Sequence, residues 1–268
     1  ADIVELRIDY IPELQNALTC IEKSLKSKTK PVIITNRPER EGGKFKGSEQ
    51  DRLHLLQKAI ELGADYVDVE YDSINQISRR NSSKIIISHH NFKETPHNLI
   101  KIYNDICQHK PDIVKIVTYA NDITDNIRIF ELLKSAKVPT ISFCMGELGY
   151  ISRILTSRFG GFLTFASLEK GKESALGQLT VNELSNIYHF KEINRETKLY
   201  GIIGNPVSHS MSPAIHNAAF IEKGLNNVYV PLKIAEIETF MKKCREIDFR
   251  GFSVTIPHKE SILPFLDD

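Results

Sequence analysis

The chain has 268 residues, of which 41% are hydrophobic and 26% are charged, as in ordinary globular proteins rather than disordered ones. A formal net charge of +1 gives no reason to expect nucleic acid or an anionic membrane as a partner. No apolar run approaches the roughly 18 residues that span a bilayer, and the four cysteines form no paired motif, which argues against a zinc site or a disulfide framework.

The first two-thirds of the chain repeat one pattern, in which a short β-branched strand is followed by a polar turn and an amphipathic helix. One such helix is expected at Glu49–Leu62, with Ser48 as its N-terminal cap. Strands that alternate with helices predict parallel βαβ units. Seven strands are expected, at Asp2–Asp9, Pro31–Asn36, Asp65–Tyr71, Lys84–His90, Asp112–Tyr119, Pro139–Met145 and Phe162–Ala166.

Such units build either an open doubly wound sheet or a TIM (β/α)8 barrel. Polar residues follow nearly every expected strand at its carboxyl end, where barrel enzymes place their chemistry, and this favours the barrel. Because a closed barrel needs eight strands and the chain opens on a strand at Ala1, we expect a barrel without its first βα unit.

A change of composition marks the end of the barrel. A last helix is expected at Val181–Tyr188, followed by the charged stretch His189–Lys198, which is typical of a linker. A new strand is then expected at Leu199–Ile203. We therefore expect a barrel domain over residues 1–190, a linker over 191–198 and a second segment over 199–268.

Charged residues occur where a barrel would bury them. Side chains alternate across a strand, so Glu5 and Arg7 share the face opposite Val4, Leu6 and Ile8. The apolar face should meet the helices, which puts Glu5 and Arg7 in the barrel mouth, either as a structural ion pair or as a substrate site.

Lys115 lies in the middle of the expected strand Asp112–Tyr119. Burial should lower its pKa, and a neutral amine is what attack on a carbonyl requires. An ion pair with a buried carboxylate, for which Glu70 is a candidate, is the structural alternative. His89 and His90 end another strand and point to opposite faces, so at most one of them enters the mouth as a proton carrier.

Three further features are candidates for holding an anionic substrate. Arg37 ends its strand and is followed by Glu41-Gly42-Gly43. Arg153 follows the strand Pro139–Met145. The short polar segment Ser174–Gln178 resembles a flexible lid.

Taken together, these features closely resemble the type I 3-dehydroquinate dehydratases. The similar segments are ADIVELRID, TNRPEREGG, SHHNF, DIVKIV, GYISR and SALGQ, which occur in family order over residues 1–188. The resemblance implies an eight-stranded barrel that this chain enters at the second strand. It also implies that Lys115 forms the Schiff base and that His90 is the catalytic histidine, with Glu41 as its partner carboxylate. The residues matching those that hold the substrate are Glu5, Arg7, Arg37, Arg153, Ser174 and Gln178.

The reaction that this resemblance implies is dehydration of 3-dehydroquinate to 3-dehydroshikimate in the shikimate pathway of aromatic amino-acid biosynthesis, without metal or organic cofactor. Two positions depart from the common family pattern. Asn91 stands where many members have aspartate, and Leu176 stands where many have proline. Asn91 bears on the orientation of the histidine, and Leu176 on the stiffness of the lid.

Residues 199–268 resemble the beginning of a shikimate dehydrogenase through YGIIGNPVSHSMSPAIHN and GFSVTIPHK. The resemblance implies that Ser210, Ser212 and Thr255 contact the substrate and that Lys259 is the catalytic lysine. Ser212 is alternatively a helix cap. No glycine-rich dinucleotide fingerprint follows a strand, so NADP is expected to bind only in a longer chain that also carries the dehydrogenase activity.

Two other functions compete with this interpretation: another Schiff-base barrel lyase, such as an aldolase, and an inactive or partner-binding fragment of a bifunctional protein. The expected partners are the small molecules 3-dehydroquinate and 3-dehydroshikimate, not nucleic acid or membrane. A homodimer is left open. The expected location is the cytoplasm, with a plastid as the alternative.

Overall fold

A computed structural model describes residues 1–79 and 82–266. The chain forms two compact units, the first from residues 1–90 and 100–116 and the second from residues 91–99 and 117–268. Within the described ranges, no helix is long and apolar enough to cross a membrane.

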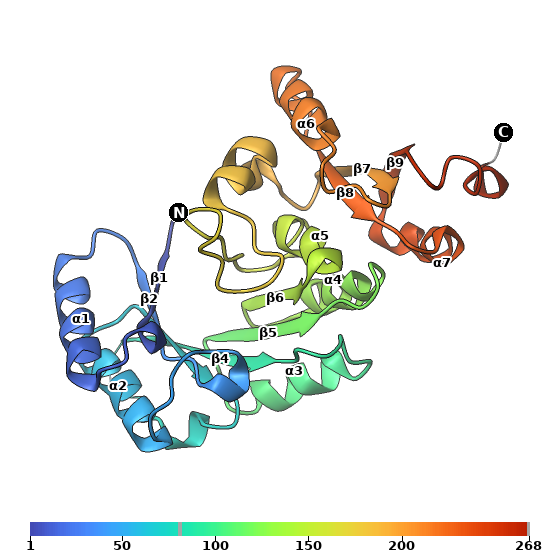
Figure 1. Ribbon diagram of the computed structural model, residues 1–268. Coiled ribbons are helices and arrows are strands. Elements are labelled where there is room, and N and C mark those ends of the chain that lie inside the picture. Colours follow the sequence, from blue (N-terminus) through green and yellow to red (C-terminus); the bar gives the residue numbers. More distant parts are fainter. Residues whose placement is uncertain (80–81, 267–268) are drawn as a thin grey trace. The chain divides into compact units, whose positions relative to one another are not determined.

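The first unit contains the amino-terminal strands of a sheet whose strand order, β1-β2-β3-β4-β5-β6, follows the chain. Figure 1 shows α1 and α2 side by side next to β1 and β2. The elements that lie wholly or mostly in this unit are β1 (Val4–Arg7), α1 (Leu14–Ser27), β2 (Val32–Thr35), α2 (Glu49–Glu61), β3 (Tyr66–Glu70), β4 (Lys84–His90), α3 (Leu99–Cys107) and β5 (Ile113–Tyr119).

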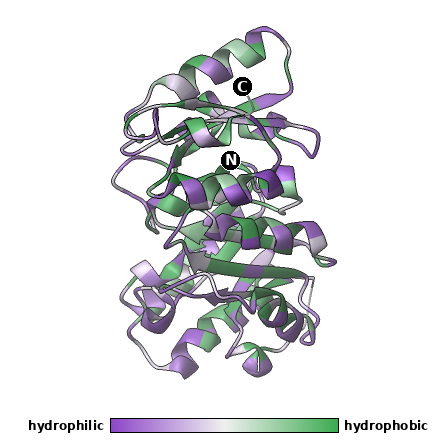
Figure 2. Ribbon diagram, turned by 90° about the vertical axis from the view of Figure 1, so that its right-hand side faces the viewer, coloured by the Kyte–Doolittle hydropathy of each residue, from purple (hydrophilic) through white to green (hydrophobic). Residues whose placement is uncertain are grey.

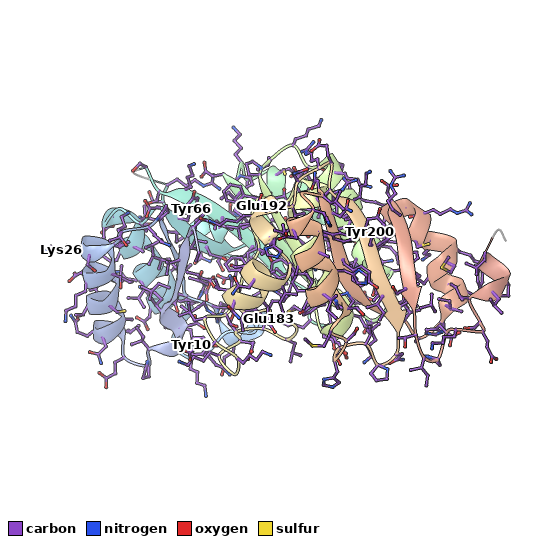
Figure 3. The ribbon with its side chains drawn as sticks, turned by 90° about the horizontal axis from the view of Figure 1, so that it is seen from above. Tyr10, Lys26, Tyr66, Glu183, Glu192 and Tyr200 are labelled. Atoms are coloured by element: carbon purple, nitrogen blue, oxygen red, sulfur yellow. The ribbon has the colours of Figure 1, made fainter. Side chains whose placement is uncertain are left out.

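Local sequence explains these elements. Ser48 is the N-cap of α2 and accepts a hydrogen bond from the Asp51 amide at 3.1 Å, as expected from the sequence. Apolar residues of the helices and strands are buried while the outer helix surfaces are polar (Figure 2), as at the exposed Lys26 of α1 (Figure 3). The parallel register pairs Thr35 with Asp68 and Glu70 with Ser88, so polar side chains from three strands meet on one face.

The second unit continues with α4 (Asp125–Ser135), β6 (Thr140–Met145), α5 (Tyr150–Ile154) and a π-helical turn over Glu183–Ile187. A separate parallel sheet of order β8-β7-β9 follows. Its elements are β7 (Lys198–Gly204), α6 (Ser212–Glu222), β8 (Asn227–Lys233), α7 (Ile237–Lys243) and β9 (Phe249–Val254).

Side chains hold α6 to this small sheet. Asn217 accepts a hydrogen bond from the Tyr229 amide at 2.7 Å and donates one to the Tyr229 carbonyl at 2.9 Å. The ring of Tyr200 in β7, labelled in Figure 3, packs near α6. Its centroid lies 5.6 Å from that of the Phe220 ring. The last expected domain extends to residue 268, and its final two positions lie outside the described residues.

Two expectations about the fold are wrong in detail. Phe162–Ala166 is not a strand, because its backbone is irregular, although the Phe162 amide donates to the Thr140 carbonyl of β6. Within the described residues, the sheet therefore has six strands rather than seven. Val4 is exposed rather than covered by helices, although Ile8, from the same expected apolar face, is fully buried.

Candidate active site

Lys115 lies in β5 with 5% of its surface exposed, as expected from its apolar strand. Its Nζ is 2.8 Å from Asp68 Oδ2 in β3 and 4.0 Å from Glu5 Oε1 in β1. The buried carboxylate in the printed contacts of Lys115 is thus Asp68, whereas Glu70 was the candidate for the ion-pair alternative. Asp68 and Glu70 lie two residues apart on one face of β3, and it is the shorter acid that contacts the lysine.

Asp68 is fully buried and bonded on both oxygens. Oδ1 accepts a hydrogen bond from Ser88 Oγ at 2.6 Å, and Oδ2 lies 2.6 Å from Arg37 Nη2 in addition to Lys115. Burial opposes ionisation, yet the charges of Arg37 and Lys115 hold the pKa of Asp68 well below its usual range. Asp68 is therefore a fixed anion beside the lysine.

Arg37 is held between two acids. Its Nη1 donates to Glu70 Oε1 at 2.6 Å and to Ser88 Oγ at 2.7 Å, and the same guanidinium contacts Asp68. Glu70 is also bonded to the fully buried Arg52 of α2. Burial acts against the charge of Arg37, but Asp68 and Glu70 outweigh it and raise its pKa. Arg37 is thus a charged part of the site in this state.

His90 and Glu41 are paired as the sequence predicts. His90 Nδ1 is 2.8 Å from Glu41 Oε2, which also accepts the His90 backbone amide at 3.0 Å. The alternation along β4 puts His90 on the face of Ser88, whereas the half-buried His89 points the other way.

Two glycines bring Glu41 to this position. Glu41 ends a single 3-10 turn, and Gly42 caps it with φ +73°, in the left-handed region that favours glycine. A Cβ on Gly43 would lie 1.9 Å from the Arg37 carbonyl oxygen, so only glycine allows this close approach. The glycine pair of the sequence therefore has a structural reason beside the histidine.

The electrostatics of this pair suit a base. Burial lowers the pKa of His90 well below its usual value, and the positive charges of Arg37 and Lys115 lower it further, so the ring is neutral at pH 7. Burial raises the pKa of Glu41 to about 7, against the opposing effect of Arg37. The pair of Glu41 and His90 can therefore take up or release a proton at the Glu41 carboxyl near neutral pH.

Glu5 and Arg7 do not form an ion pair with each other in the described contacts. Glu5 accepts a hydrogen bond from Thr35 Oγ1 at 2.8 Å. Arg7 makes a bidentate pair with the buried Asp9 of the following turn, at 2.8 and 2.7 Å. The charges on this face of β1 thus have separate partners, and Glu5 is the one near Lys115.

Arg153, in α5 of the second unit, is a buried arginine without a matching acid. Only 1% of its surface is exposed, its guanidinium lies 4.1 Å over the Phe143 ring, and Nε and Nη2 have no hydrogen-bond partner among the described residues. Burial lowers its pKa to about 10. An unmatched buried guanidinium of this kind is suited to an anion, and a carboxylate would accept its two donors together.

The expected lid residues bond to each other. Gln178 Oε1 accepts from the Ser174 amide at 2.8 Å and from Ser174 Oγ at 3.2 Å. The Leu176 carbonyl accepts the Gly146 amide at 3.2 Å, and a Cβ on Gly177 would lie 2.4 Å from the Gly146 oxygen. The segment is therefore docked on the loop after β6.

Four candidate residues lie in the loops and helix that follow strands of the small sheet. Of these, Ser210, Ser212 and Thr255 are half-buried and Lys259 is exposed. The alternative role of Ser212 as a helix cap is wrong. Met211 is the N-cap of α6 without a side-chain bond, and it is Ser210 Oγ that accepts the Ser212 amide, at 3.2 Å.

A metal ion and a dinucleotide are each held by a characteristic pattern of residues. The described residues contain no cluster of three or more His, Cys, Asp or Glu side chains that could hold a metal ion. Gly201 and Gly204 lie within β7, paired in register with β8, so they do not form the glycine turn that cradles a pyrophosphate.

Sequence reasoning missed three residues of the site: Asp68, Ser88 and Arg52. Asp68 lies on the same face of β3 as Glu70, and Ser88 lies on the same face of β4 as His90. The sequence had already singled out Glu70 and His90 as candidates. An acid or hydroxyl at alternate positions of an apolar strand was the available signal. Arg52 looked like an ordinary charged helix residue, and only the structure shows it fully buried against Glu70.

Together, these elements form an α/β fold with a curled parallel sheet, a half-barrel that carries a buried lysine and a histidine–carboxylate pair in one unit. The family model described as type I 3-dehydroquinase matches residues 1–195, and the chain belongs to that family. Residues 202–268 match the shikimate dehydrogenase substrate binding domain.

Individual relatives agree with these matches. The chain is 44% identical over its full length to the chloroplastic bifunctional 3-dehydroquinate dehydratase/shikimate dehydrogenase of Arabidopsis thaliana, and it spans 46% of that protein. It is 39% identical to the 3-dehydroquinate dehydratase of Methanopyrus kandleri, over 68% of this chain and 84% of that protein.

Solved structures give the same picture. The S. pombe AroM dehydroquinate dehydratase and shikimate dehydrogenase structure has a TM-score of 0.60 at 30% identity, over 100% of this chain and 54% of that chain. The 3-dehydroquinate dehydratase of Aquifex aeolicus has a TM-score of 0.58 at 31% identity, over 69% of this chain and 85% of that chain.

Proposed function

We propose that this chain dehydrates 3-dehydroquinate to 3-dehydroshikimate, a shikimate-pathway step, through a Schiff base on Lys115. The observation that carries the proposal is the buried Lys115, with its anion Asp68, in one unit with the paired His90 and Glu41. Membership of the type I 3-dehydroquinase family supplies the substrate.

The chemistry follows from these groups. Lys115 Nζ adds to the ring ketone and water leaves, which gives an iminium that draws electrons from the adjacent carbon. Because Glu41 engages His90 Nδ1, we assign Nε2 to the removal of a proton from that carbon. The protonated histidine then returns this proton to the departing hydroxyl, which leaves as water. A water molecule finally hydrolyses the product iminium, which breaks the bond to Nζ, releases 3-dehydroshikimate and restores Lys115.

The remaining residues are proposed to hold the substrate. Arg153 takes the carboxylate, because its buried donors have no other acceptor among the described residues. Ser174 and Gln178 belong to the lid and contact the substrate. The closed lid excludes bulk water. The groups proposed to complete the substrate contacts are Glu5, Arg7 and Arg37.

The domain division is also a proposal: a barrel domain of the dehydroquinase type over residues 1–190, a linker over 191–198, and a segment of the dehydrogenase substrate-binding type over 199–268. Ser210, Ser212 and Thr255 would bind 3-dehydroshikimate there, and Lys259 would be catalytic. Reduction with NADP is assigned to a longer protein. We propose a cytoplasmic location, with a plastid as the alternative, since the Arabidopsis relative is chloroplastic.

The proposed function predicts a covalent adduct. Incubation of the 268-residue chain with 3-dehydroquinate and sodium borohydride should reduce the imine to a stable secondary amine. Peptide mapping by mass spectrometry should find the added mass on Lys115. Lys84, exposed at the beginning of β4, is the internal control and should stay unmodified. A folded protein without an adduct on Lys115 would refute the mechanism.

The pH dependence of turnover is expected to reflect Glu41. Its raised pKa of about 7 means that the carboxyl keeps its proton up to neutral pH, whereas the ionised form is what accepts His90 Nδ1–H. Turnover should therefore rise with pH through about 7. In Glu41→Gln this limb should disappear, with a rate about tenfold lower, because the amide oxygen still accepts the bond. A limb that persists unchanged in Glu41→Gln would assign it to another group.

A further inference from the structure

We propose that Asp68 is the counter-ion of the Lys115 iminium and keeps that imine protonated through the reaction. The inference rests on the proposed function, since it concerns the intermediate formed there. It assigns a role to a carboxylate that the sequence did not single out, and it starts from the 2.8 Å contact between Asp68 Oδ2 and Lys115 Nζ.

Charge conservation gives the first step of the case. An ammonium and a ketone yield an iminium and water, so one positive charge stays on Nζ while its N–H groups fall from three to one. An iminium is an electron sink only while it holds this last proton. In the described contacts, Asp68 is a fixed anion at hydrogen-bond distance from Nζ, and Glu5 lies 4.0 Å away.

Asp68 is built to stay in place and ionised. Ser88 holds Oδ1, Arg37 lies against Oδ2, and the side chain is fully buried. A carboxylate with these partners neither rotates away nor takes up the proton. It therefore acts as a stationary negative charge rather than as a proton carrier.

The surrounding charges show why a counter-ion is needed. The positive charge of the nearby Arg37 disfavours another positive charge on the Lys115 iminium. The burial of Lys115 disfavours that charge as well. The charged or titratable groups described near Nζ are Glu5 on β1, Arg37 just after β2, Asp68 on β3 and the neutral His90 on β4. Without Asp68, the iminium would lose its proton to become a neutral imine near pH 7.

Glu70 provides a matched control. It is a buried carboxylate on the same face of β3 and bonds to the same arginine, but its described contacts are with Arg37 and Arg52 rather than with Lys115. Glu70→Gln disturbs the ion-pair network to a similar degree. It should leave the protonation of the imine unaltered.

Two reductants read out this protonation. Cyanoborohydride reduces iminium ions but not neutral imines, whereas borohydride reduces both. The full chain and its variants would be treated with 3-dehydroquinate and each reductant at pH 7, and adducts on Lys115 would be quantified by mass spectrometry. In Asp68→Asn the cyanoborohydride-to-borohydride ratio should fall about tenfold for each pKa unit that the imine loses. It should recover at pH 5, while Glu70→Gln keeps the unsubstituted ratio.

Each outcome decides one point. No adduct with either reductant in the unsubstituted chain would sink the proposed function itself. An adduct there, together with an unchanged ratio in Asp68→Asn, or an equal fall in Glu70→Gln, would overturn the counter-ion alone. If circular dichroism shows Asp68→Asn unfolded, Ser88→Ala decides: loss of one bond to Oδ1 should lower the ratio severalfold, and an unchanged ratio would overturn the inference.

Discussion

Lys115→Arg is expected to lose turnover of 3-dehydroquinate by on the order of 10⁵-fold, about 7 kcal/mol in the barrier, while the protein stays folded. Arginine keeps the positive charge beside Asp68 but does not form an imine. The substitution therefore separates the two roles that the sequence left open for this lysine. If Lys115 were only an ion-pair partner, Lys115→Arg would retain most of the activity.

The stability of a second variant completes this test. Lys115→Met removes the charge and should destabilise the fold by about 3–5 kcal/mol, because Asp68 loses one of its two buried cationic partners. Lys115→Arg should cost much less in denaturant unfolding followed by circular dichroism. Lys84→Arg, at an exposed position, is the control and should leave both turnover and stability unaltered.

His90→Ala is expected to lower turnover about 10²- to 10⁴-fold, the usual contribution of a general acid–base residue, while Lys115 still forms the imine. The reason is that His90, positioned by Glu41, acts on the proton after the imine exists. Steady-state rates and borohydride trapping on the same sample measure the two steps separately. Loss of trapping together with turnover would place His90 in imine formation instead.

His89 is the matched control for this experiment. It precedes His90 in β4, points to the opposite face and is half-buried. His89→Ala should therefore leave turnover within about twofold of the unsubstituted chain. If His89→Ala were the damaging change, the facing of the two histidines would have been assigned wrongly.

Much of the first unit could be predicted from the sequence because its strands are apolar and short. The expected Lys84–His90 coincides with β4, and the cap at Ser48 is confirmed. Alternation along a strand correctly separated His90 from His89. These features depend on local sequence alone, which a single chain records well.

What escaped prediction depends on neighbours in space. Glu70 was a candidate partner for the lysine from the sequence, but in the folded chain Asp68 contacts it. The expected strand Phe162–Ala166 failed for the same reason, since extended backbone becomes a strand only beside a partner. Nothing in the sequence indicated that Arg52 is buried. Its position on α2 is buried because Arg52 pairs with Glu70 of β3, which is distant in sequence.

The ion pairs behind Lys115 form a chain of alternating charge that runs from β5 to the first turn of α2: Lys115, Asp68, Arg37, Glu70, Arg52 and Glu49. Any single replacement within its buried part leaves an adjacent charge without its counterpart. Evolutionary drift at these positions should consequently be slow, and where it occurs it should proceed by coupled exchanges of neighbours. Co-variation across related sequences would then trace this line of charges through the protein interior.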